Sequence, residues 1–399
     1  MSMYCPYTYE CYPQGLNYPW TFPMPSEKER HRRWQAIRKS MEKSNFDCII
    51  TTAGPTFMPA TKYVQYISNY VPFATKGAYL VFPLKGEPQL LFSNAIGPQF
   101  VHMASETSWV RDIVGSFDPI RDVVKKIEQL GLQKGRLGIL GYSSGIFSAS
   151  DLDYLRVHLP EADFNDASAA VNGAMNEISR TSEEELKLLR KACEILDFSF
   201  DAVAEAFKPG ATECDLWAAA EHAIIKNGGW PQHGNLVTTA PRPIFPRAPA
   251  SHRNLLPGDI GIFEVTAIYG GVSPQTCYAI SLGEPQPDVR EMFKFCEGLY
   301  QFSLAELEKQ RPFIDIEHDL AQRIHNAGFE PMTPQIHIYN MTDEMPMDSP
   351  PQPGDYFTVH PNFCDPKYTV GAKLGDCVRM TKDGKVERLN RPPARLNII

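Results

Sequence analysis

The sequence lacks the features that are typical of membrane, secreted, disulfide-bonded and nucleic-acid-binding proteins. No apolar run approaches the roughly 18 residues of a membrane-spanning helix, and the N-terminus lacks the basic-then-apolar layout of a secretory leader. The nine cysteines form no CxxC pair and no regular spacing, which favours free thiols in a reducing cytoplasm. The net charge is −8 and the basic residues are scattered, so we expect no nucleic-acid partner and no membrane partner.

The chain has 399 residues, and 43% of them are hydrophobic. This length and composition are enough for roughly two globular domains. Residues 1–26 are rich in proline, tyrosine and cysteine. We expect them to form an extension whose aromatic side chains pack onto the body or onto a partner chain.

The next segment alternates between helical and strand patterns. Ser26 and Glu29 have the spacing of a capping box, which predicts the start of a helix. Strands are predicted over 47–51, 78–82, 89–92 and 137–140, and a helix over 120–130. Strands that alternate with helices predict an α/β domain over residues 27–172.

Residues 173–399 begin with a different pattern. A long helix starts after Ser182, a second runs from Thr212 to the glycine pair at 228–229, and two more are predicted over 288–309 and 316–327. Between them lies PGDIGIFEVTAIYGGVSPQTCYA, residues 257–279, which reads as two strands joined at Gly270-Gly271. Glu264 sits within the apolar first strand, and Gln275 follows eleven residues later on the returning strand.

This segment resembles the catalytic hairpin of the creatinase, aminopeptidase P and prolidase family, whose fold is called pita-bread. The resemblance spans roughly residues 27–399. It implies an α/β fold class, with a creatinase/prolidase-like N-terminal α/β domain followed by a C-terminal pita-bread catalytic domain of α+β type with pseudo-twofold symmetry. It also implies a homodimer in which each pocket borrows residues from its neighbour.

The metal enzymes of that family hold two ions with Asp, Asp, His, Glu and Glu. The matching positions here are Glu264, Gln275, Ile336, His360 and Gly375. The family has four carboxylates among these five positions, and this chain has one, Glu264. The resemblance therefore predicts no metal pair and no cofactor. One alternative stays open, a single ion held by Glu264, His337 and His360.

Creatinase works without metal and uses a histidine, but the matching position here is Arg247. An arginine can hold a substrate carboxylate, although it cannot act as a base. The predicted catalytic residues are therefore Glu264, His360 and His337. The predicted substrate-binding residues are Arg247, Gln275, His233 and Tyr66. Cys277 and Cys377 flank the site in sequence, and we expect them to be packing residues.

These residues predict a metal-independent, creatinase-like hydrolase that cleaves a C–N bond of a small carboxylated molecule by acid–base catalysis. Peptidase activity is disfavoured, because the family's peptidases rely on metal-bound water. Two alternatives remain, a lyase or decarboxylase that uses the same pocket and an inactive homologue that acts as a binding protein.

Overall fold

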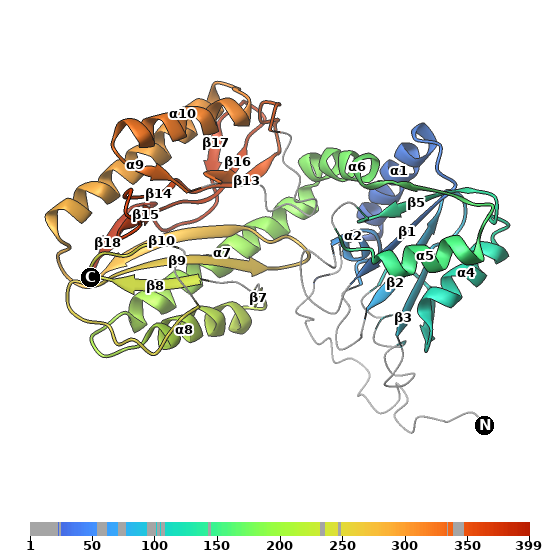
Figure 1. Ribbon diagram of the computed structural model, residues 1–399, viewed down its shortest axis with the longest axis horizontal. Coiled ribbons are helices and arrows are strands. Elements are labelled where there is room, and N and C mark those ends of the chain that lie inside the picture. Colours follow the sequence, from blue (N-terminus) through green and yellow to red (C-terminus); the bar gives the residue numbers. More distant parts are fainter. Residues whose placement is uncertain are drawn as a thin grey trace. The chain divides into compact units, whose positions relative to one another are not determined.

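The computed structural model describes residues 23, 25–53, 62–70, 77–93, 101, 104, 108–142, 145–231, 236–245, 249–332, 334–337 and 347–399. The chain divides into two compact units between Ile178 and Ser179. The division falls near the end of helix α6, Ser168–Thr181. Among the described residues, the strands of each unit pair only within that unit (Figure 1), and each unit has its own apolar core.

The first unit is built on a six-stranded sheet with the order β4-β3-β2-β1-β5-β6. Its strands are β1 Cys48–Ala53, β2 Ala78–Pro83, β3 Gln89–Ser93, β4 Asp112–Ser116, β5 Arg136–Leu140 and β6 Asp163–Asp166. β1, β2 and β3 pair antiparallel, whereas β4, β5 and β6 each join a neighbour in parallel. The four strands predicted from the apolar segments are confirmed. β4 and β6 were not predicted. Most of their residues are only half-buried, so these strands lack the apolar run that marks a buried strand.

Helices cover this sheet. They are α1 Glu27–Lys43, α2 Lys62–Ser68, α4 Pro119–Gln129, α5 Ala149–His158 and α6. The start of α1 is as predicted, because the Ser26 side chain accepts a hydrogen bond from the Glu29 backbone. Trp34 holds α1 to α2 by donating to the Ile67 carbonyl at 2.7 Å.

The second unit contains three sheets. One has the order β18-β10-β9-β7, with β8 also paired to β9; the others are β11-β14-β15 and β12-β13-β16-β17. The strands of the first are β7 Trp230–Pro231, β8 Leu236–Ala240, β9 Ile260–Ile268, β10 Gln275–Ser281 and β18 Leu396–Ile398. The remaining strands are β11 Glu330–Pro331, β12 Ile336–His337, β13 Tyr356–Val359, β14 Asn362–Cys364, β15 Gly371–Lys373, β16 Asp376–Met380 and β17 Val386–Arg388.

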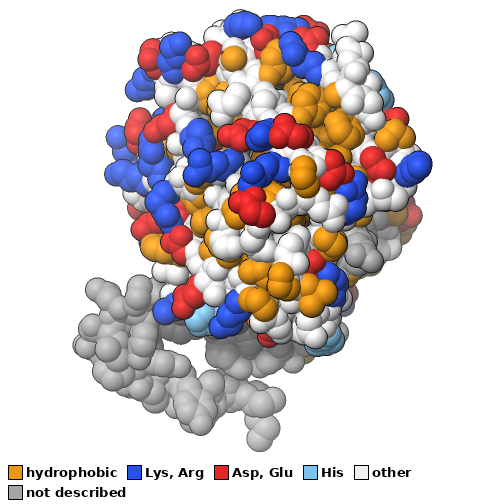
Figure 2. Space-filling view, turned by 90° about the vertical axis from the view of Figure 1, so that its left-hand side faces the viewer, with side chains coloured by type: hydrophobic (Ala, Val, Ile, Leu, Met, Phe, Trp, Pro, Cys, Tyr) orange, Lys and Arg blue, Asp and Glu red, His pale blue; other side chains and the backbone are white. Residues whose placement is uncertain are grey.

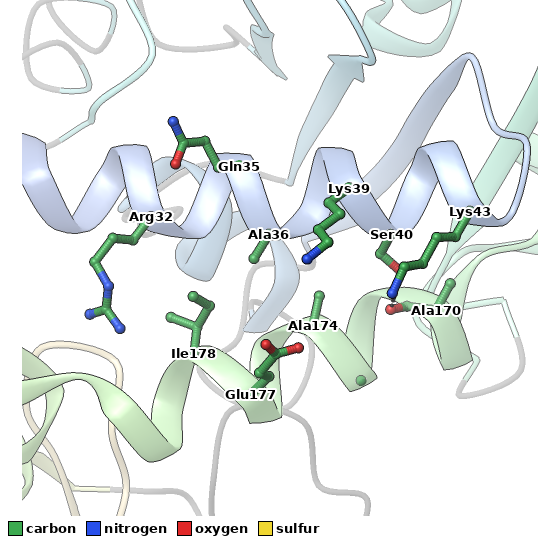
Figure 3. A pocket seen from close by; sticks show the side chains of 11 residues that line it. Arg32, Gln35, Ala36, Lys39, Ser40, Lys43, Ala170, Ala174, Glu177 and Ile178 are labelled. Carbon is green, nitrogen blue, oxygen red and sulfur yellow. Dashed lines mark hydrogen bonds between the residues drawn. The ribbon is translucent and has the colours of Figure 1, made fainter.

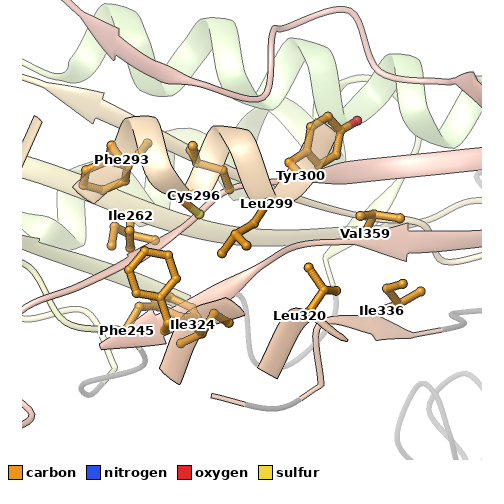
Figure 4. Close-up of a cluster of buried hydrophobic side chains, with 14 of the residues drawn as sticks. Phe245, Ile262, Phe293, Cys296, Leu299, Tyr300, Leu320, Ile324, Ile336 and Val359 are labelled. Carbon is orange, nitrogen blue, oxygen red and sulfur yellow. The ribbon is translucent and has the colours of Figure 1, made fainter. Parts of the chain in front are cut away.

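Two helix pairs pack against opposite faces of the long β9–β10 hairpin. The pairs are α7 Glu183–Ala206 with α8 Glu213–Lys226, and α9 Pro287–Glu308 with α10 Phe313–Asn326. Phe263 and Val265 of β9 belong to the core under α7 and α8, whereas Ile260 and Ile262 belong to the core under α9 and α10 (Figure 4). Because alternate residues of a strand face opposite sides, Glu264 lies on the same face as Ile262.

On the face that Figure 2 shows, Lys and Arg side chains are mixed with Asp and Glu, and groups of hydrophobic side chains lie between them. Of the helices in the described part of the chain, none combines the length and the hydropathy needed to cross a bilayer.

A buried carboxylate anchors the short strand β12. Glu317 of α10 accepts hydrogen bonds from the backbone N–H groups of Gln335 at 3.0 Å and Ile336 at 2.6 Å. Burial raises the pKa of Glu317 from its ordinary value of 4.5 to about 7, and these two hydrogen bonds act in the opposite direction.

This shift makes stability depend on pH. Since the folded protein holds the Glu317 proton more tightly than the unfolded chain, its contribution is complete below pH 4.5 and is lost as the pH rises through 7. The loss is at most about 3 kcal/mol. Glu317→Gln stays neutral and keeps an acceptor for both N–H groups, so its unfolding free energy should change less over this range.

Urea unfolding of the wild type and Glu317→Gln between pH 5 and 8 measures the difference. Glu291→Gln, at an exposed position of α9, is the control and should follow the wild type. Parallel pH profiles for the wild type and Glu317→Gln would contradict the expectation.

Candidate active site

The β9–β10 hairpin brings two side chains of different chemistry together. Gly270 and Gly271 have φ of 60° and 88°, which suits a tight hairpin turn and confirms the prediction. The register then pairs Glu264 with Cys277, and directly opposed residues share a face of the sheet. The Cys277 thiol donates to Glu264 Oε2 at 3.8 Å.

The charge of Glu264 is balanced by Lys373 of β15, whose Nζ forms an ion pair with Glu264 Oε2. Only 6% of the lysine side chain and 16% of the glutamate side chain are exposed. Burial acts to lower the pKa of Lys373, but electrostatic interactions with the neighbouring Cys277 and Glu264 groups outweigh it, and the pKa is raised. Burial raises the pKa of the Cys277 thiol far above its usual value, although Lys373 opposes this. At neutral pH Lys373 is therefore an ammonium and Cys277 a neutral thiol.

His360 completes this group. It follows β13, is 1% exposed, and its backbone N–H donates to the Gln335 carbonyl at 2.8 Å. One ring nitrogen of His360, the Cys277 sulfur and a Glu264 oxygen all lie within 4.8 Å of one another. The structure thus brings together Glu264 and His360, the two residues at family ligand positions that keep a side chain able to carry charge.

Gly375 pairs with Cys277 of β10 at a point where its backbone also lies close to Val359 and His360. Its N–H and carbonyl each form a hydrogen bond of 2.8 Å with the Cys277 backbone. A Cβ atom at this position would lie 1.8 Å from the Val359 carbonyl oxygen and 2.5 Å from the His360 Cα. No side chain fits here without moving the strand that carries His360.

The five matched positions do not fit a pair of metal ions. Of the five residues, Glu264 carries a carboxylate, and a carboxylate side chain would not fit at position 375. Ile336 is 1% exposed and packs in the apolar core with Val359 (Figure 4). Gln275 is buried and neutral. Two divalent cations need bridging carboxylates to offset their mutual repulsion, and this set cannot provide them.

A buried network supports the strand that follows Gly375. Asp376 accepts from the Tyr300 hydroxyl at 2.5 Å and from Arg388 Nε at 2.9 Å. Burial raises the pKa of Asp376, although Arg388 opposes this. The network ties β16 to α9 and so helps to set the position of Gly375 beside Cys277.

Three other predicted site residues can be placed only in part. Gln275 lies on β10, and its carbonyl accepts from Thr358 Oγ1 at 3.4 Å. The backbone of His337 pairs with Thr358, and its side chain lies outside the described residues. Tyr66 is buried in α2 of the first unit, with the guanidinium carbon of Arg33 4.2 Å from its ring centre. Arg247 and His233 lie outside the described residues.

Sequence reasoning missed Lys373 and underrated Cys277. The structure pairs Glu264 with Lys373, a residue that the sequence analysis did not name. The signal was a lysine in an otherwise apolar stretch, two residues before Gly375. Cys277 was expected to be a packing residue, but the strand register places its sulfur at Glu264.

A separate groove of about 400 Å³ runs between α1 and α6 in the first unit (Figure 3). Lys39 and Lys43 of α1 line one side, and Glu177 of α6 lines the other. The two lysines are exposed, so their flexible side chains form no ordered binding set. The lining comes entirely from the first unit, and the groove is not part of the group at Glu264.

The fold and the hairpin define a two-domain protein of the pita-bread class with a carboxylate at the centre of its catalytic sheet. Residues 33–174 match the creatinase/prolidase N-terminal domain, and residues 187–382 match metallopeptidase family M24. The chain belongs to this creatinase/prolidase M24 family. The predicted family and fold class are confirmed.

Similar proteins cover most of the chain. An Xaa-Pro dipeptidase of Pyrococcus horikoshii is 23% identical, over 90% of this chain and 97% of that protein. An Xaa-Pro dipeptidase of Lactobacillus delbrueckii is 22% identical, over 80% of this chain and 88% of that protein. The structure of an X-Pro aminopeptidase from Thermotoga maritima has a TM-score of 0.76 at 16% identity and covers 92% of this chain and 99% of that chain. The Pyrococcus horikoshii prolidase structure has a TM-score of 0.72 at 19% identity, over 90% and 98%.

These findings correct the predicted function. The relatives are named Xaa-Pro dipeptidases and the matched family is a metallopeptidase family. The prediction of a metal-independent, creatinase-like hydrolase was therefore wrong, and so was the statement that the protein is not a metallopeptidase. Neither the lyase nor the inactive-homologue alternative has better support. The error arose because the substitutions at the ligand positions were interpreted as evidence that the protein catalyses a different reaction.

The contact at Gly375 can be tested by adding one methyl group. We expect Gly375→Ala to lower the free energy of unfolding by about 3 kcal/mol, because backbone rather than a flexible side chain opposes the new Cβ. Gly298→Ala is the matched control. Gly298 lies on α9 with nothing within 4 Å of its Cβ position, and alanine there should be up to about 1 kcal/mol more stable. Equal stability of both variants in chemical denaturation would contradict the close approach.

Proposed function

We propose that this chain hydrolyses the amide bond of short peptides that carry proline in the second position. The sequence relatives, matched over most of their length, are named for this substrate class. The observation that carries the proposal is the buried ion pair of Glu264 with Lys373, together with a His360 ring nitrogen within 4.8 Å of a Glu264 oxygen.

Amide hydrolysis needs three kinds of group, and this set supplies them. A base must accept a proton from the attacking water, and the Glu264 carboxylate or the His360 imidazole can do so. A positive charge must stabilise the oxygen of the tetrahedral intermediate, and the Lys373 ammonium is buried where such a charge acts strongly. The prolyl nitrogen must be protonated as it leaves, which His360 in its charged form can do.

Substrate contacts complete the proposal. Arg247 is a suitable partner for the terminal carboxylate of a dipeptide, because a guanidinium binds a carboxylate with two parallel hydrogen bonds. Gln275, His233 and Tyr66 are proposed as further substrate contacts, and His337 as a second proton carrier. These assignments rest on the family positions of the residues.

The setting of the protein is also a proposal. We infer a cytoplasmic homodimer that acts on a small-molecule substrate. The seven cysteines among the described residues are all free, and six of them are buried, which suits a reducing compartment. The homodimer is carried by the family resemblance, and sedimentation of the purified chain tests it.

The test of the reaction is release of proline from Xaa-Pro dipeptides, measured with and without added divalent cations. Wild-type protein should hydrolyse Met-Pro or Ala-Pro faster than Ala-Ala. Glu264→Gln keeps the shape of the side chain but removes the base, so kcat should fall by about a hundredfold or more. Glu284→Gln, at an exposed position, should match the wild type. Absence of turnover for every Xaa-Pro dipeptide under all these conditions overturns the proposal.

A further inference from the structure

We propose that Glu264, Cys277 and His360 form a binding site for one divalent cation, with a preference for zinc, and that the ammonium of Lys373 competes with the ion. This ligand set differs from the family's five-ligand set in its thiol and in its capacity for a single ion. The inference concerns the pocket of the proposed function but does not depend on its proton transfers, because an ion bound at Glu264 and His360 would occupy the atoms assigned there to the base and the acid. It is tested by binding alone.

The spacing of the three ligand atoms is close to what one ion requires. Zinc bonds to nitrogen, oxygen and sulfur are about 2.0–2.3 Å long, so ligand atoms around a tetrahedral ion are about 3.3–3.8 Å apart. The Cys277 sulfur and Glu264 Oε2 are already 3.8 Å apart. All three ligand atoms lie within 4.8 Å of one another, so small side-chain rotations close the site.

The strand register holds this arrangement in place. Glu264 and Cys277 are directly opposed on β9 and β10. The two hydrogen bonds between Cys277 and Gly375 fix the strand that lies against His360. Cys277 and His360 are each 1% exposed. Ligands that are ordered before binding lose little conformational entropy when the ion arrives.

The ligand types select the ion. A thiolate, an imidazole and one carboxylate suit zinc, which is borderline-soft and is bound by such mixed sets. Magnesium and calcium require six or more oxygen ligands, and this group offers at most two. Three protein ligands also leave one coordination position open, which is the arrangement of zinc sites that bind a small molecule.

Lys373 sets the strength of binding. Its Nζ already forms an ion pair with Glu264, so an incoming cation must displace it. The ammonium also lies 4.8 Å from the centre of the Phe245 ring, and a ring face can hold a displaced cation. Removing the lysine charge therefore frees Glu264 and removes repulsion from the ion.

The experiment is a titration of metal-free protein with zinc by calorimetry and with cobalt by absorption spectroscopy. We expect one ion per chain and a sulfur-to-cobalt charge-transfer band. Cys277→Ser should lose that band and bind at least about tenfold more weakly. Lys373→Met should bind about tenfold more tightly. Cys364→Ser, at a buried cysteine of β14, and Lys294→Met, at an exposed lysine of α9, are the controls and should match the wild type.

Glu264→Gln serves as a second ligand variant, and it too should weaken binding if Cys277→Ser does not fold. The inference is overturned by binding of two ions per chain, by absence of binding, or by an unchanged band in Cys277→Ser. It is also overturned if Lys373→Met binds no more tightly. Zinc binding together with no dipeptide turnover in either the metal-free or the zinc-loaded protein overturns the proposed function alone, and turnover by a protein that binds no zinc in the titration overturns this inference alone.

Discussion

A carboxylate enclosed by apolar strands needs a positive charge beside it, and Lys373 provides that charge for Glu264. Removing one partner of such a buried pair typically costs about 3–5 kcal/mol, because the other charge is left in a medium that solvates it poorly. Glu264 belongs to the long hairpin and Lys373 to a separate three-stranded sheet. The ion pair therefore joins two sheets at the point where the side chains with useful chemistry meet.

A second constraint acts at the same point through the backbone. Cys277 and Gly375 exchange two hydrogen bonds, and the approach is so close that no Cβ fits beside Val359 and His360. A glutamate in place of Gly375 would force this contact apart. The tight packing of the strands at Gly375 therefore excludes the ligand side chain that the family has at this position.

The family is defined by packing, whereas its chemistry depends on a few side chains. The hairpin, the two helix pairs and the sheet order follow from apolar residues on alternating faces. The fold is shared with solved structures that are only 16–19% identical. The fold does not require metal ligands at the family's ligand positions, and two of them, Ile336 and Gly375, are packing residues here. For this reason the fold was predicted correctly and the reaction was not.

The sequence by itself determined four strands of the first unit, the helix starts, the hairpin and the position of Glu264 within it. These are local properties, because they depend on hydrophobic period, capping residues and glycine turns. The two-residue turn at Gly270-Gly271 also fixes the register that places Cys277 opposite Glu264. Only the tertiary structure decided that Lys373 and His360 reach Glu264. Lys373 lies 109 residues away along the chain, and this contact depends on how separate sheets pack, which no local pattern records.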